Sequence, residues 1–190
     1  ETHAVHIGTN QKSSDMQRFI DKDRADGSGL HLIDINQTDA RIRTVANFLS
    51  RYDPERILVV SARQYGQRPA RKFAQSIGAK RIVGRFIPGT LTNPKLRTYT
   101  EPEVLVVTDP AADSQALSEA VSTGLPIVGI VDANNTLRNV DLALPANNKG
   151  RRSLALIYWL LAREMLTSRG ATNYADWERA QDVEEWESTF

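Results

Sequence analysis

The chain has 190 residues, of which 41% are hydrophobic and 25% are charged, and its formal net charge is +1. This length suits one well-buried domain and is short for two. The chain contains no cysteine, which excludes a disulfide framework, a thiolate nucleophile and a cysteine-ligated metal site, and favours a reducing, cytoplasmic location.

Residues 1–15 are expected to form an N-terminal arm that lacks the basic start and apolar core of a secretory signal. His3 and His6 lie close together in this arm. Their spacing allows a weak metal pair, but a simple arm is the favoured interpretation, so no metal site is predicted.

Strand-like and helix-like segments alternate along residues 1–170. Short runs rich in Val, Ile and Leu are typical of strands buried on both faces of a parallel sheet, and they lie at 30–35, 57–62, 104–109 and 126–132. Weaker runs expected to join the same sheet lie at 81–86 and 140–144. Amphipathic helical patterns lie at 39–52, 66–77, 113–124 and 151–170. The alternation predicts a single α/β domain with a mainly parallel sheet of about five strands flanked by helices.

The last of these helices contains the longest apolar run, "LALIYWLLA" from Leu154 to Ala162. The run is about half of the roughly 20 residues that span a bilayer, so no membrane span is expected. Residues 171–190 contain two tryptophans and a run of acids, and they are expected to form a short peripheral helix or arm.

Charge is distributed unevenly along the chain. Ten basic residues and no Asp or Glu lie between Arg56 and Thr100, whereas the balance reverses between Glu101 and Asn148, with seven acids against Arg138 alone. This layout suits a basic face that docks on nucleic acid. Chance clustering on a solvated surface is the alternative.

The segment "VSARQYGQRPARKF" reads as a strand, a polar loop and a helix, a layout in which a helix N-terminus can receive a phosphate. It matches neither the lysine-containing loop of nucleotidases nor the glycine spacing of dinucleotide binders. Its polar side chains suit phosphate oxygens and stacking on exposed bases, and the predicted RNA-binding residues here are Arg63, Gln64, Tyr65, Gln67, Arg68, Arg71 and Lys72.

Two further segments are predicted to bind RNA. The loop "GRFIPGTLTNPKLR" (84–97) has no acid, base or nucleophile pair, its prolines make it stiff, and Phe86 and Ile87 are expected to anchor it. Its predicted RNA-binding residues are Arg85, Thr90, Thr92, Asn93, Lys95 and Arg97. The segment "NNKGRRS" (147–153) places basic residues at the start of the last helix, where they oppose the helix dipole. An anion bound nearby would remove this conflict. Its candidates are Asn147, Asn148, Lys149 and Arg151.

An enzyme is the rival interpretation. Asp34, Asp109 and Asp132 follow strand-like runs, so they could gather at the carboxyl edge of the sheet as acid, base or metal ligands of a phosphosugar- or nucleotide-binding enzyme. The favoured interpretation is that these acids cap helices and turns, because no His, Cys or Lys follows at a supporting spacing. A protein-interaction module is a third possibility, supported only by the acidic tail.

Several blocks occur in one order: "GTNQKSSDM", "GQRPARKFA", "GRFIPGTLTNP", "EPEVLVVTDPAAD", "LPIVGIVDANNTLRNVDLALPANNKG" and "SLALIYWLLAREML". With these blocks the chain resembles the archaeal and eukaryotic branch of the ribosomal small-subunit protein two family, whose eukaryotic members are also described as laminin-receptor precursors. The resemblance runs from about Gly8 to Gly170. Bacterial relatives carry an inserted coiled coil, and no long heptad segment is present here.

The resemblance implies a flavodoxin-like or Rossmann-like three-layer domain without enzymatic activity or cofactor. It also implies binding to 16S-type ribosomal RNA on the solvent side of the small subunit, next to neighbouring ribosomal proteins. Carried over block by block, the binding surface would include Gly66, Gln67, Arg68, Arg71 and Lys72, the loop 85–94, and Asn147, Asn148 and Lys149.

Overall fold

The structure is a computed structural model that describes residues 3–21, 27 and 29–189. At its centre is one open sheet of five parallel strands in the order β2-β1-β3-β4-β5. The strands are β1 (Ile57–Ser61), β2 (Lys80–Val83), β3 (Val104–Val107), β4 (Ile127–Val131) and β5 (Leu142–Pro145). The predicted α/β fold with a parallel sheet of about five strands is confirmed.

The apolar run at 30–35 is not a strand of this sheet, so that prediction is wrong. Leu32 and Ile33 make only isolated antiparallel bridges, to Ile7 and Ile20 respectively. Both Leu32 and Ile33 are buried. Burial therefore accounts for the apolar pattern, because an extended segment covered by neighbours needs the same residues as a buried strand.

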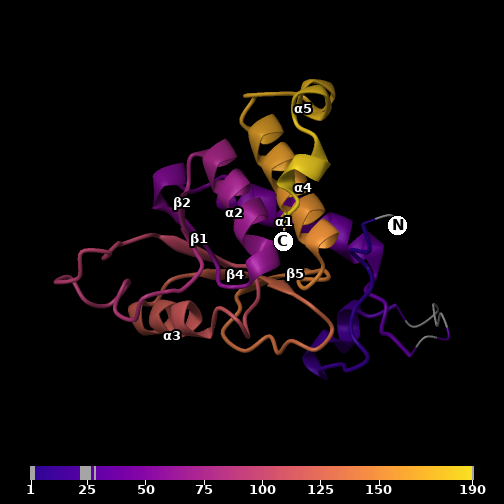
Figure 1. Cartoon of the computed structure of the whole chain (residues 1–190), viewed down its shortest axis with the longest axis horizontal. Coiled ribbons are helices and arrows are strands. Elements are labelled where there is room, and N and C mark those ends of the chain that lie inside the picture. The colour runs from indigo at the N-terminus through magenta and orange to yellow at the C-terminus, as the bar shows by residue number, and fades with distance from the viewer. Residues whose placement is uncertain (1–2, 22–26, 28, 190) are drawn as a thin grey trace.

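Helices cover both faces of the sheet and give the fold its three layers (Figure 1). The α-helices of the described residues are α1 (Ile35–Leu49), α2 (Gln64–Ile77), α3 (Ser114–Thr123), α4 (Arg151–Ser168) and α5 (Tyr174–Ala180). The 3-10 helices are η1 (Asp15–Phe19), η2 (Pro54–Arg56) and η3 (Val183–Trp186). Within the described residues, every helix is too short or too polar to traverse a bilayer.

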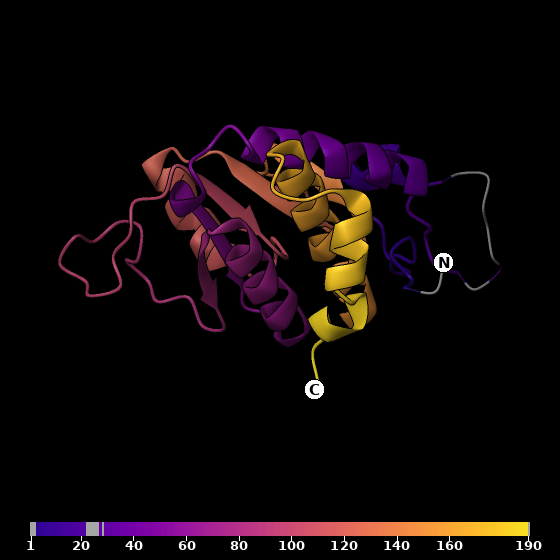
Figure 2. The ribbon, with the colours of Figure 1, turned by 90° about the horizontal axis from the view of Figure 1, so that it is seen from above.

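The two faces of the sheet are set by alternation along the strands. Val59 and Val106 belong to the larger core, which they form with α1, α2 and α4. Leu58 and Leu105 point the other way and pack with residues of α3. Figure 2 shows α2 and α4 side by side above one face of the sheet. The basic segment at the start of α2 is thereby brought next to the start of α4.

The last described segment folds back onto α4 and is part of the larger core. Trp177 of α5 and Trp186 of η3 are both buried in that core with Trp159 of α4. The ring centroid of Trp177 lies 5.9 Å from that of Trp159 and 6.0 Å from that of Trp186. The indole N–H of Trp159 also donates to the carbonyl oxygen of Gln181 at 3.0 Å. Aromatic packing therefore fixes this segment against the domain.

Candidate nucleic-acid interface

Helix α2 presents a group of basic residues on the side opposite to the core. Phe73 and Ile77 of this helix are buried in the larger core. Arg68, Arg71 and Lys72 lie on the other side, where they line a cavity of about 370 Å³. The predicted residues Gln64 and Gln67 line the same cavity, and Tyr65 of the same helix is 41% exposed. The structure therefore brings together most of the residues predicted at this segment.

A second basic cavity lies beside the edge strand β2. It has a volume of about 700 Å³ and is lined by Arg71, Lys80 and Arg81, with Thr98 and Thr100 among its other residues. Arg71 lines both cavities, so the two are neighbours on the surface. Of the described residues that line them, none is acidic. Lys80 and Arg81 were not predicted as site residues, although both lie in the acid-free stretch of the sequence.

The loop between β2 and β3 is held in shape by a carboxylate from α3. The two oxygens of Glu119 accept hydrogen bonds from the backbone N–H of Gly89 at 2.6 Å and of Leu91 at 3.0 Å. Burial acts to raise the pKa of Glu119, but these N–H donors and the side-chain amide of Gln115 together outweigh it and hold the pKa below its ordinary value. Ionised Glu119 is therefore a structural anchor of the loop.

The predicted residues of this loop divide into two groups. Thr90 is buried, and its hydroxyl donates to the carbonyl oxygen of Ile87 at 2.6 Å, so it supports the turn. Ile87 is 47% exposed, so the expectation that it anchors the loop is wrong. Phe86 is half-buried against the core on the α3 side of the sheet, as expected, and Leu91 of the same loop is buried in that core. The side chains that face solvent are Arg85, Thr92, Asn93, Lys95 and Arg97.

The exposed and half-buried bases of α2, β2 and this loop are called the cationic surface below. Its members are Arg68, Arg71, Lys72, Lys80, Arg81, Arg85, Lys95 and Arg97.

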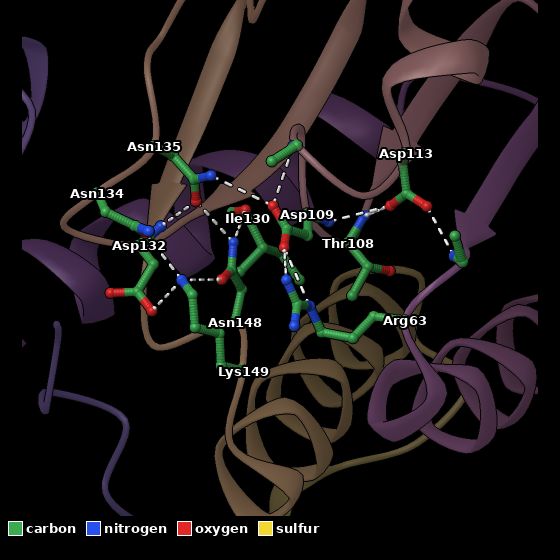
Figure 3. Close-up of polar contacts among 12 residues, drawn as sticks. Arg63, Thr108, Asp109, Asp113, Ile130, Asp132, Asn134, Asn135, Asn148 and Lys149 are labelled. Carbon is green, nitrogen blue, oxygen red and sulfur yellow. Dashed lines mark hydrogen bonds and ion pairs between the residues drawn. The ribbon is translucent and has the colours of Figure 1, made fainter.

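Arg63 and Asp109 are paired at the carboxyl edge of the sheet (Figure 3). The Nε of Arg63 donates to Oδ2 of Asp109 at 3.0 Å, and Nη2 donates to the same oxygen. The other oxygen of Asp109 accepts from the side-chain amide of Asn135 at 3.2 Å and from the N–H of Ala111 at 3.0 Å. Arg63 is thus engaged inside the protein.

A second group of contacts fills the neighbouring part of this edge. The Nζ of Lys149 lies 2.9 Å from Oδ2 of Asp132 and also donates to the side-chain oxygens of Asn134 and Asn148. The amide of Asn148, which is fully buried, donates to the carbonyl oxygen of Ile130 at 3.0 Å. Figure 3 shows these side chains turned toward one another. The structure places Asn148 and Lys149 in this internal network.

Asn147 stabilises the turn that leads into α4. Its side-chain oxygen accepts from the N–H groups of Lys149 and Gly150, each at 3.0 Å. Its side-chain nitrogen donates to the carbonyl oxygen of Ala4 at 3.2 Å. Asn147 therefore joins the N-terminal arm to α4.

The three acids of the enzyme interpretation are not gathered into one site. Asp34 lies before α1, where it accepts from the N–H of Asn36 at 2.9 Å and the amide of Gln37 at 3.1 Å. Asp109 and Asp132 are each paired with a base, as described above. Among the residues that the structure describes, no group of three or more His, Cys, Asp or Glu side chains could hold a metal ion.

The acidic segment 182–189, called the strap below, crosses the starts of α2 and α4. Glu185 lies 2.9 Å from the Nζ of Lys72, and its backbone oxygen accepts from Nε of Arg68 at 2.8 Å. Glu187 lies 3.3 Å from Nε of Arg151 and 3.7 Å from Nε of Arg152. No local pattern in the sequence indicates these pairs, because Lys72 and Glu185 are 113 residues apart.

Comparisons with known proteins identify the family. A family profile described as "Ribosomal protein S2" matches residues 2–99 and 96–168. The "Small ribosomal subunit protein uS2" of Haloquadratum walsbyi (strain DSM 16790 / HBSQ001) is 58% identical over 167 residues. This alignment covers 88% of the chain but 59% of the relative, so it spans less than two thirds of the relative's length. The resemblance found in the sequence is confirmed: this chain belongs to the ribosomal protein S2 family.

Proposed function

We propose that this chain is a structural, non-enzymatic constituent of the small ribosomal subunit that binds small-subunit rRNA through the cationic surface. Family membership supports the first part, since the relative from Haloquadratum walsbyi is named a small ribosomal subunit protein. A structural protein of this kind needs phosphate contacts spread over a wide area and no turnover, so it can keep a ligand-binding fold without catalytic groups.

The binding of rRNA through the cationic surface is supported by one observation: the two basic cavities meet at Arg71. This residue lines both the cavity on α2 and the cavity beside β2, which is called the groove below. None of the described residues that line either cavity is acidic. Guanidinium and ammonium groups arranged in this way can contact successive phosphates of an RNA backbone. Thr98 and Thr100 add hydroxyl groups in the groove.

The other predicted RNA-binding residues then have two roles. Side chains exposed on the loop, such as Thr92 and Asn93, would contact RNA together with the neighbouring bases. Tyr65, with its exposed ring, could stack on an unpaired base. The residues engaged in internal contacts would shape the surface without touching RNA: Arg63, Thr90, Asn147, Asn148 and Lys149.

Under this proposal the partners are small-subunit rRNA and neighbouring ribosomal proteins, and the location is the small subunit in the cytoplasm. No cofactor and no small-molecule substrate belong to the proposal.

The test is incorporation into the small subunit after charge reversal in the groove. The triple variant Arg71→Glu, Lys80→Glu, Arg81→Glu is expected to be lost from small subunits separated by sucrose-gradient sedimentation. A matched control reverses three exposed bases outside the cationic surface, Arg51, Arg138 and Arg179, and has the same net charge. Wild-type occupancy of the groove variant, or equal loss of both variants, would contradict the proposal.

A further inference from the structure

The strap meets two bases of the cationic surface and two bases at the start of α4. Glu185 and Glu187 contact four basic residues, of which Lys72, Arg68 and Arg151 were predicted from the sequence to contact RNA. Figure 1 shows the end of the chain between α2 and α4. Two carboxylates therefore lie where phosphates would be expected.

The strap is held by contacts that do not involve these carboxylates. Trp186 is fully buried in the core between them. The hydroxyl of Ser188 donates to the carbonyl oxygen of Tyr65 at 3.1 Å. In a regular helix that carbonyl would accept from the residue four positions on, which is Pro69 and has no N–H. Ser188 therefore satisfies an acceptor that the helix leaves open.

The carboxylate of Glu185 is free to move away from its partner. The side chain of Glu185 is 65% exposed and that of Lys72 is 27% exposed. Exposed ion pairs of this kind are weak and readily exchanged. The cavity of about 370 Å³ between α2 and the strap is lined by Lys72 on one side and Ser188 on the other. A phosphate could therefore enter beside the strap without unseating Trp186.

We propose that the strap is an internal ligand of the cationic surface: an RNA phosphate binds beside Lys72 of α2 by replacing the carboxylate of Glu185, whereas Glu187 stays paired with Arg151 and Arg152. Trp186 and Ser188 keep the strap in place during this exchange. The strap thereby lowers the affinity of the free protein for RNA. This inference rests on the proposed function, because it assumes that the α2 surface binds RNA.

At the start of α4, Arg151 and Arg152 lie in the first turn. Bases at this position oppose the helix dipole, and an anion beside them removes the conflict. In the structure that anion is Glu187, whose side chain is only 15% exposed. Glu187 is therefore a further anchor of the strap at α4.

The test compares neighbouring glutamates of the strap. Glu185→Gln removes the carboxylate that contacts Lys72, whereas Glu184→Gln removes one for which the described residues show no ion pair, with the same change in net charge. Affinity for a transcript of small-subunit rRNA is measured by filter binding over a series of salt concentrations. Thermal unfolding of both variants is followed to check that the fold is kept.

Glu185→Gln is expected to raise the affinity about two- to fivefold at low salt, and Glu184→Gln by clearly less. The slope of log affinity against log salt should change little for Glu185→Gln, because Lys72 contacts a phosphate in both complexes and the same number of phosphates is neutralised.

Equal effects of Glu184→Gln and Glu185→Gln, or no gain from the latter, would overturn the inference. Such a result would leave the proposed function intact as long as the groove variant (Arg71, Lys80 and Arg81 to Glu) still loses RNA binding. Absence of salt-dependent binding by the wild-type protein would instead contradict the proposed function itself.

Discussion

Arg63 at the start of α2 donates two hydrogen bonds to one carboxylate oxygen of Asp109, which follows β3. Asp109 is 1% exposed, so this carboxylate is buried beside its basic partner. We predict that Arg63→Met lowers the free energy of unfolding by about 2 to 3 kcal/mol, because it leaves a buried carboxylate without its cation. Chemical denaturation measures the loss.

The matched control is the exposed pair between Arg43 and Asp39, whose side chains are 64% and 58% exposed. Arg43→Met should change the free energy of unfolding by no more than about 0.5 kcal/mol. Equal losses of unfolding free energy in the two variants would show that the Arg63 pair stabilises the fold no more than an exposed ion pair does.

Gly66 is predicted to be intolerant of a side chain. A Cβ atom at this position would lie 2.4 Å from Oγ of Ser61 and 2.8 Å from Cγ2 of Thr108, and both neighbours are buried. Gly66→Ala should therefore destabilise the fold by about 1 to 3 kcal/mol, although alanine is the better helix former. Adding Ser61→Ala should recover part of this loss in a double-mutant cycle, and strictly additive effects would contradict the steric explanation.

Asp113 is predicted to make stability depend on pH in the acid range. Burial raises its pKa to about 6, against N–H donors from Ala62, Thr108 and Asp109 that lower it. The folded pKa lies above the unfolded value of about 3.9, so the stabilising effect of protonation is complete below pH 4. This contribution, about 3 kcal/mol, is lost as the pH rises from about 4 to 6.

Carboxyl-carbon NMR measures this pKa directly, with an expected midpoint near pH 6 for Asp113. Denaturation between pH 4 and 7 measures the stability, and Asp113→Asn should remove the contribution of this residue to the slope. A midpoint at or below pH 4 would contradict the prediction.

Glu119 is predicted to control the order of the loop between β2 and β3. Its two oxygens accept from the N–H groups of Gly89 and Leu91. Glu119→Gln keeps one acceptor oxygen, so one N–H loses its partner, and amide exchange at these positions should accelerate about five- to thirtyfold. Glu103→Gln, an exposed change of the same kind, is the control, and unchanged exchange in Glu119→Gln would contradict the anchoring role.

Strands β1, β3 and β4 were predictable because they are short, apolar and buried on both faces of a parallel sheet. The run 30–35 has the same composition but lies outside the sheet, where Leu32 and Ile33 are buried by other segments. Composition reports burial there, whereas strand pairing depends on partners distant in the sequence. The N-cap role of Asp34 agrees with the favoured interpretation of the strand-end acids.

The acid-free stretch of the sequence predicts the cationic surface, but it does not show which polar residues of the predicted segments are buried. Asn148 lies in a polar motif and is nevertheless fully buried, because its amide meets backbone and side-chain oxygens inside the domain. Lys80 and Arg81 were missed because their position depends on β2 being the edge strand. The strap was missed because its pairing with Lys72 depends on the tertiary fold.

A density map of the small ribosomal subunit assembled with this chain would show directly whether rRNA binds the cationic surface. We predict rRNA backbone density in contact with Arg71, Lys80 and Arg81 and continuing over the loop between β2 and β3. A map in which these residues face solvent while rRNA contacts a different face of the domain would contradict it.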